Sequence, residues 1–97
     1  MPRRQALTSE TLTVSTAAIS LTAAKLTKEV TVVTVQVESN SIRYWTSATA
    51  PTSTNGILAT DGTKLEFDIA QAHGLRMIRA GGADAKAHVE YIREFTT

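Results

Sequence analysis

Two histidines are the residues of this chain best suited to acid–base or metal chemistry. His73 and His88 lie fifteen residues apart, and the chain has no cysteine that could complete a metal site with them. His73 falls in a predicted turn closed by Gly74. His88 alternates with Lys86 and Glu90 on the polar side of a predicted strand. We therefore expect two solvated surface histidines, and no catalytic residue, metal ligand or cofactor-binding residue.

The carboxylates give no sign of catalysis either. Those that lie closest in sequence share outward strand positions: Glu66 with Asp68, and Glu90 with Glu94. The cationic residues Lys64, Lys86 and Arg93 lie near them, a pattern typical of cross-strand ion pairs on a wet surface. A glycosidase pair would instead flank a cleft. The chain also lacks a Gly-x-Ser-x-Gly elbow and a phosphate-binding glycine loop, so we expect no enzyme.

Composition excludes several further classes. The 97 residues suffice for one domain, and ten cationic against nine anionic residues leave a formal charge of +1, which predicts neither nucleic-acid binding nor attachment to an anionic membrane. No run of about 18 apolar residues is present, and no signal-peptide-like run follows the basic start. Without disulfides, so small a core is expected to gain stability from homo-oligomers or a larger assembly.

Threonine content and alternation indicate the elements that must position these side chains. Sixteen threonines and seven serines favour pleated structure over helix. We predict strands over residues 33–38, 42–46, 57–59, 64–69, 75–80 and 85–91, with a single helical turn over residues 69–74. Turn residues at 39–40, 60–63 and 81–84 predict hairpins, and residues 47–55 form a loop with Pro51 and Gly56.

The N-terminal third allows two interpretations. Leu12 and Val14 alternate with threonines, and Ile19 and Leu21 suggest a second short strand. The alanines within residues 16–28 favour a helix instead. With strands there, the chain is predicted to be all-β, an antiparallel β-sandwich or small barrel of immunoglobulin-like size, with an extended N-terminal arm over residues 1–9 and one domain over residues 10–97.

Arginine and tryptophan side chains are the residues most suited to an interface. Arg76 and Arg79 are three apart, so a regular strand places them on opposite faces. If Ile42 and Tyr44 face the core, Trp45 faces outward beside Arg43; the alternative has Trp45 at the end of the core and Tyr44 at its rim. The interface candidates are Arg3, Arg4, Leu7, Arg43, Trp45, Pro51, Arg76 and Arg79.

Two stretches resemble known families. Residues 42–52, Ile-Arg-Tyr-Trp-Thr-Ser-Ala-Thr-Ala-Pro-Thr, resemble the strand-turn motif of chitobiase C-terminal-like immunoglobulin modules, which carry Asp-Gly where this chain has Ser47-Ala48. Residues 27–95 are similar in their order of features to small virion proteins of tailed bacteriophages: a Val-rich strand, Ile-Arg-Tyr, a Pro-Thr loop, Gly-Ile-Leu, a strand ending in Phe-x-Ile, Ile-Arg-Ala-Gly-Gly and Val-x-Tyr.

The second resemblance implies a β-sandwich without enzymatic activity that decorates or cements a capsid, or serves in the neck or tail. We therefore expect a virion structural protein, assembled in the cytoplasm of the bacterial host, that binds the major capsid protein and copies of itself. A carbohydrate- or receptor-binding module of a tail fibre or secreted hydrolase is the alternative, with Tyr44, Trp45 and residues 47–55 as its platform.

Overall fold

Strands make up most of the chain in the computed structural model, which describes residues 2–96 and the side chains of residues 3–95. The elements follow one another as β1 (Pro2–Val14), the 3-10 helix η1 (Ala23–Lys25), β2 (Val32–Glu38), β3 (Ile42–Trp45), β4 (Ile57–Ala59), β5 (Lys64–Asp68), α1 (Ile69–Gly74), β6 (Arg76–Arg79) and β7 (Ala85–Thr96). Within this part of the chain, no helix has the length and apolar character needed to cross a membrane.

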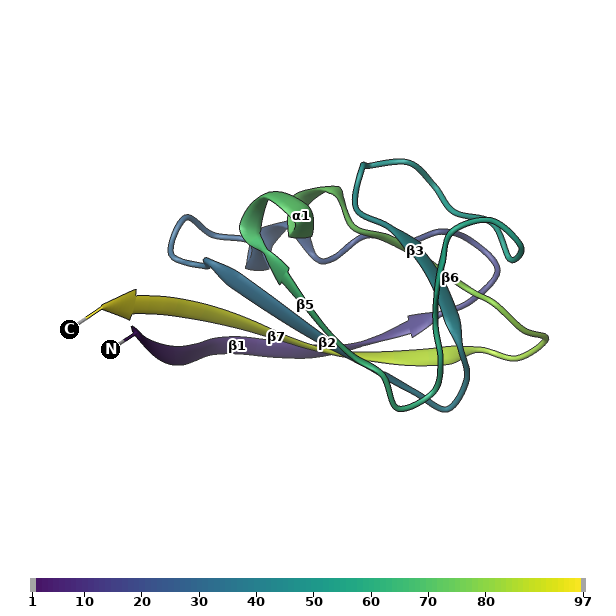
Figure 1. Ribbon diagram of the computed structural model, residues 1–97, viewed down its shortest axis with the longest axis horizontal. Coiled ribbons are helices and arrows are strands. Elements are labelled where there is room, and N and C mark those ends of the chain that lie inside the picture. The colour runs from purple at the N-terminus through teal and green to yellow at the C-terminus, as the bar shows by residue number, and fades with distance from the viewer. Residues whose placement is uncertain (1, 97) are drawn as a thin grey trace.

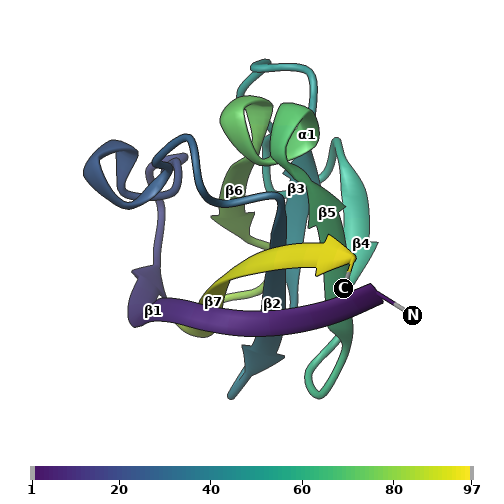
Figure 2. The same ribbon diagram turned by 90° about the vertical axis from the view of Figure 1, so that its left-hand side faces the viewer.

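The strands form two antiparallel sheets. One has four strands in the order β1-β7-β2-β5, and the other has three in the order β4-β3-β6. Helix α1 lies on one side of the molecule, and β1 and β7 run along the opposite side (Figures 1 and 2). The predicted class, an all-β antiparallel sandwich, is confirmed.

The core lies between the inward rows of the two sheets. The four-stranded sheet contributes two rows that are at least 98% buried: Val33, Val35 and Val37 from β2, and Ala85, Ala87, Val89 and Tyr91 from β7. Ile42 and Met77 complete the core from the three-stranded sheet. Both rows of the four-stranded sheet agree with the predicted alternation, because side chains two apart along a strand share a face.

The three predicted hairpins are wrong, although their turns form. Residues 39–41 connect β2 to β3, residues 60–63 connect β4 to β5, and residues 80–84 connect β6 to β7, so that each joins one sheet to the other. Ser39 and Gly62 adopt the positive φ values typical of such turns, 78° and 90°. Turn residues therefore predicted where the chain reverses, whereas burial of the inner face of each sheet against the other decides which strand it pairs with next.

The predicted N-terminal arm is part of the sheet over its described residues. Residues 2–9 belong to β1, which pairs with β7 along its whole length and shifts register between Ala6 and Thr8; Met1 lies outside the described residues. The N-terminal end of β1 and the C-terminal end of β7 lie side by side and extend beyond the rest of the molecule (Figure 1). The extended segment is thus a paired ribbon made from both ends of the chain.

The segment between β1 and β2 follows the strand-and-turn interpretation. Its helical content is η1, three residues long. Ile19 and Met77 exchange two backbone hydrogen bonds of 2.8 Å, which attach this segment to the edge of β6. The alternative of a helix over residues 16–28 is therefore wrong, because pairing with β6 outweighs the helix propensity of the alanines.

Helix α1 is the single turn predicted from the sequence. The Asp68 carboxylate accepts a 2.8 Å hydrogen bond from the Gln71 backbone N–H, and the Gln71 side chain accepts one from the Asp68 N–H. At its end, Gly74 meets the chain that leaves β3. A Cβ atom on Gly74 would lie 2.2 Å from the Thr46 carbonyl oxygen, so only glycine permits this approach.

Candidate functional site

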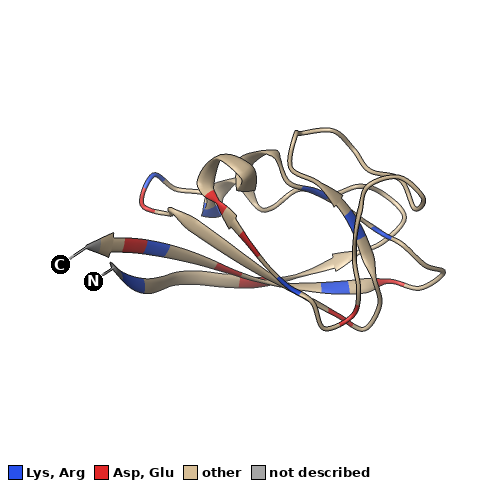
Figure 3. Cartoon of the chain, viewed as in Figure 1, with Lys and Arg blue, Asp and Glu red and all other residues tan. Residues whose placement is uncertain are grey.

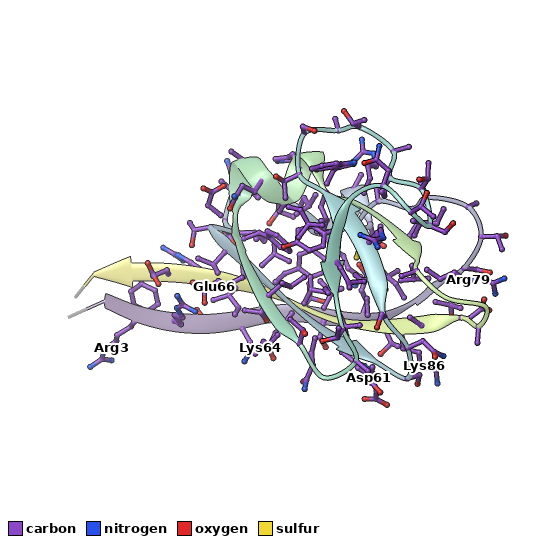
Figure 4. All side chains as sticks on the ribbon, turned by 45° about the vertical axis from the view of Figure 1, so that its right-hand side comes forward. Arg3, Asp61, Lys64, Glu66, Arg79 and Lys86 are labelled. Carbon is purple, nitrogen blue, oxygen red and sulfur yellow. The ribbon has the colours of Figure 1, made fainter. Side chains whose placement is uncertain are left out.

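The predicted interface residues divide between two parts of the molecule. Arg3, Arg4 and Leu7 lie on β1, in the four-stranded sheet. The other five lie on β3, on β6 and in the loop that follows β3: Arg43, Trp45, Pro51, Arg76 and Arg79. Arg3 and Arg79 are far apart in Figure 4. The eight candidates therefore do not form one surface.

Arg43 holds the loop of residues 47–56 against the three-stranded sheet. Its guanidinium donates to the carbonyl oxygens of Ser53, at 3.1 Å, and Gly56, at 2.9 Å. Pro51 is buried in the same place, and Gly56, with a φ of 141°, brings its backbone against Pro51 and Arg43. Arg43 and Pro51 therefore fix the loop rather than face a partner.

Arg76 and Arg79 lie on opposite faces of β6, as their spacing predicts. Arg76 is opposite the outward Trp45, and its Nη1 donates to the Leu75 carbonyl at 2.9 Å. Arg79 is opposite the buried Ile42 and forms a 2.8 Å ion pair with Asp84. Hydrogen bonds from Ser15 and then Arg79 hold the pKa of the Asp84 carboxyl below its usual value. Both arginines therefore have partners within the chain.

The orientation of Trp45 follows the first of the two predicted arrangements. Ile42 is fully buried, and the Tyr44 ring packs edge-on against Phe67 with the ring centres 5.6 Å apart. Trp45 is half-buried on the other face of β3. Tyr44 therefore belongs to the core, and Trp45 faces outward.

Sequence reasoning missed two exposed apolar side chains on β4, the strand beside β3. Ile57 and Leu58 of β4 are 47% and 49% exposed, the large hydrophobic residues with the greatest exposure among those the structure describes. Leu58 is opposite Arg43, which makes it a diagonal neighbour of Trp45 on the outer face. Ile57 is opposite Tyr44, so it faces the inner side of the sheet at its β4 edge. We call Trp45 and Leu58, which share the outer face, the apolar surface. The three-residue run Ile57–Ala59 predicted a strand, but it was too short to reveal by alternation which side chains face outward.

A shallow groove continues this outer face toward β6. It has a volume of about 360 Å³ and is lined by Thr16, Thr52, Ser53, Ile78, Arg79 and Gly81. Ile78 is opposite Arg43 on β3, so Leu58, Arg43 and Ile78 form one row across the sheet. The loop of residues 47–56, which Arg43 holds between Leu58 and Ile78, thus separates the apolar surface from this groove.

The β1 candidates have different surroundings. Arg4 donates to Glu66 at 2.9 and 3.0 Å and to Glu94 at 2.8 Å, and this pairing holds the pKa of the Glu66 carboxyl below its usual value. Leu7 packs against the core at the register shift. Arg3 is exposed and points away from the molecule in Figure 4. Cross-strand ion pairs were predicted for these carboxylates, but Arg4 was not predicted to be the partner of Glu66 and Glu94.

The two histidines remain apart, and no group of three or more metal-ligating side chains occurs among the described residues. His73 is exposed at the end of α1. His88 joins a chain of side chains on the outer face of the four-stranded sheet: its Nδ1 lies 3.0 Å from the Thr11 hydroxyl, and its Nε2 lies 3.0 Å from a Glu38 carboxylate oxygen.

A hydroxyl, an imidazole and a carboxylate in this order are the parts of a nucleophile triad. They adjoin a hollow of about 290 Å³ lined by Ser9, Thr11, Thr34, Gln36, Lys64, His88, Val89 and Glu90. However, β7 and β2 each pair on both edges, so their backbone N–H groups are engaged in the sheet. The hydroxyl, the imidazole and the carboxylate come from β1, β7 and β2, and their hydrogen bonds connect these three neighbouring strands across the outer face.

Comparison with known proteins finds no match to any family model, curated protein or solved structure.

Proposed function

We propose that this chain is a structural adhesion protein without catalytic activity, which attaches to a protein partner through the apolar surface. The observation that carries the proposal is the half exposure of Leu58 beside an outward Trp45, on one face of the three-stranded sheet. An exposed apolar side chain beside a tryptophan is typical of protein interfaces. Because Arg43 and Arg76 already have partners within the chain, the attachment is mainly apolar and depends weakly on salt.

Within this class, we propose a structural protein of the bacteriophage virion, a capsid decoration or cement protein that binds the major capsid protein. The resemblance of residues 27–95 to such proteins supports this assignment, as does the small two-sheet fold, which suits a protein present in many copies. Cationic and anionic residues are interspersed along the whole chain (Figure 3), so attachment through one strongly charged face is disfavoured.

A carbohydrate- or receptor-binding module is less well supported. Its predicted platform combined Tyr44, Trp45 and residues 47–55. Tyr44 packs on Phe67 in the core, so one of the two rings expected to stack on a sugar is unavailable. Trp45 alone provides less flat aromatic surface than the alternative function requires.

The proposal is tested with heads purified from a phage in which the gene for this chain has been deleted. The purified full chain is added back, and its Kd is compared with those of Trp45→Ala and Leu58→Asp. If both side chains lie at the centre of the interface, each change weakens binding by about 2 kcal/mol, or about thirty-fold in Kd. Ala24→Asp, a new charge at an exposed position of η1, is the matched control and leaves binding unchanged.

Two results would overturn the proposal. The first is wild-type chain that fails to bind the heads. The second is Leu58→Asp protein that binds as well as the control. Binding of the wild-type chain to immobilised glycans that is lost in Trp45→Ala would instead support the carbohydrate-binding alternative.

A further inference from the structure

The two sheets have four edge strands, and three of these edges are protected in ways common to natural β-proteins. The backbone of Ile19 pairs with the edge of β6. Strand β4 is only three residues long. Strand β5 has five residues and carries Lys64, Glu66 and Asp68 at alternate positions. Short or charged edges of this kind disfavour pairing with another chain.

The fourth edge, on β1, is protected along only half of its length. β1 has 13 residues. Within the described residues it pairs with one strand, β7, so no strand lies along its other edge. Its first half carries Pro2, Arg3 and Arg4 and ends at the register shift beside Leu7. Its second half, residues 8–14, has the sequence Thr-Ser-Glu-Thr-Leu-Thr-Val, without Pro, Gly, Lys or Arg. We call residues 8–14 the open edge.

The single charge of the open edge is directed inward. The Glu10 carboxylate accepts hydrogen bonds from the hydroxyls of Thr22, at 2.6 Å, and Tyr91. Ser9, Thr11 and Thr13 face outward, because their partners on β7 are Glu90, His88 and Lys86. All three are exposed. The open edge therefore presents a row of hydroxyls beside unpaired backbone groups, a combination suited to strand pairing.

We propose that the open edge pairs with the open edge of a second copy of this chain, antiparallel and centred on Thr11. Two four-stranded sheets then join into one continuous sheet. On the outer face, Thr11 lies opposite Thr11 of the second copy, and Ser9 lies opposite Thr13. On the inner face, Glu10 lies opposite Leu12, and Thr8 lies opposite Val14. Threonine and serine opposite each other are favourable cross-strand pairs.

The register follows from three requirements. Centring on Thr11 pairs all of residues 8–14. Moving one strand by a single residue would place outward side chains opposite inward ones. Centring on Glu10 would place two like charges directly opposite each other, which is destabilising. This inference is independent of the proposed attachment to a capsid, because the apolar surface lies on the other sheet.

The first test uses disulfide cross-linking, which is specific because the chain has no cysteine of its own. In the proposed dimer, the two Thr11 Cα atoms are about 4.5–5.5 Å apart, within the range of a disulfide. The two Ser9 Cα atoms are separated by four residues along the strand, or about 13 Å. We expect Thr11→Cys to form a covalent dimer under mild oxidation. Ser9→Cys, the matched control, forms little.

The second test uses charge. Thr11→Lys and Thr11→Glu each place like charges opposite each other, so each variant alone is expected to be monomeric at concentrations at which the wild-type chain is dimeric. An equimolar mixture of the two variants restores a dimer containing one of each. Sedimentation and native mass spectrometry measure these states, and circular dichroism verifies that both variants fold.

An edge of seven residues is at the small end of specific interfaces, so we expect a Kd in the micromolar range or weaker. A wild-type chain that remains monomeric up to about 1 mM would overturn the proposal. Equal cross-linking of Ser9→Cys and Thr11→Cys would also overturn it. A dimer lost in Leu58→Asp but retained in Thr11→Lys would place self-association on the apolar surface instead.

Discussion

Tyr91 shows how a polar contact is built into the core at the scale of single residues. The ring is fully buried, and its hydroxyl donates to the Glu10 carboxylate. Burial, and then the bond to Glu10, raise the pKa of Tyr91. Partial burial alone would raise the pKa of Glu10, but the bonds from Thr22 and Tyr91 outweigh it and hold that pKa below its usual value. The native fold therefore favours the ionised Glu10 carboxylate.

Tyr91→Phe is expected to lower the free energy of unfolding by about 1.5–3 kcal/mol at pH 7, because the ionised carboxylate loses a buried donor. Since the folded pKa of Glu10 lies below its unfolded value of about 4.5, the stability that ionisation confers is present above pH 4.5 and lost as the pH falls through the folded pKa. Urea unfolding from pH 7 to pH 3 measures both effects. The loss on acidification should be smaller in Tyr91→Phe, and an unchanged loss would contradict this account.

Strand parity predicted much of the residue-level structure. The inward rows of β2 and β7 and the opposite faces of Arg76 and Arg79 follow from a period of two, whereas parity left two arrangements of Trp45 open. The partners of Arg4 did not follow, because Glu66 and Glu94 lie 62 and 90 residues away in the sequence. Contacts over such separations depend on strand order, which alternation does not encode.

At the scale of elements, strands and turns were predicted more accurately than their pairing. The turns at residues 39–41, 60–63 and 80–84 form where expected, yet each crosses between sheets. Hairpins at these turns would have placed consecutive strands side by side in one sheet. The crossing connections instead distribute the apolar rows over two facing sheets, and this burial is a property of the whole fold.

The contact between α1 and the end of β3 gives a prediction at this scale. The Ala48 backbone N–H donates to the Gly74 carbonyl at 2.8 Å, and a Cβ on Gly74 would collide with the Thr46 carbonyl. Gly74→Ala is expected to lower the free energy of unfolding by about 1–3 kcal/mol. Gly81→Ala, where nothing lies within 4 Å of the added atom, is the control and changes stability little. Equal effects in thermal unfolding would show that the close approach is not required.

For the whole molecule, the account depends on two surfaces that the fold leaves without a partner. The apolar surface lies on the three-stranded sheet, and the open edge lies on the four-stranded sheet. A chain with two such surfaces can bind a shell with one and its own copy with the other. Both rest on geometry that the sequence did not reveal, since the exposure of Leu58 and the one-sided pairing of β1 are set by the strand order.

The central claim, that this chain is a structural component of a virion, is tested most directly by its copy number in purified particles. Particles of the phage that carries this gene are banded by density, and quantitative mass spectrometry measures the ratio of this chain to the major capsid protein. The account predicts a fixed ratio that persists through repeated purification. Absence of the chain from infectious particles, with the protein present only in the lysate, would contradict it.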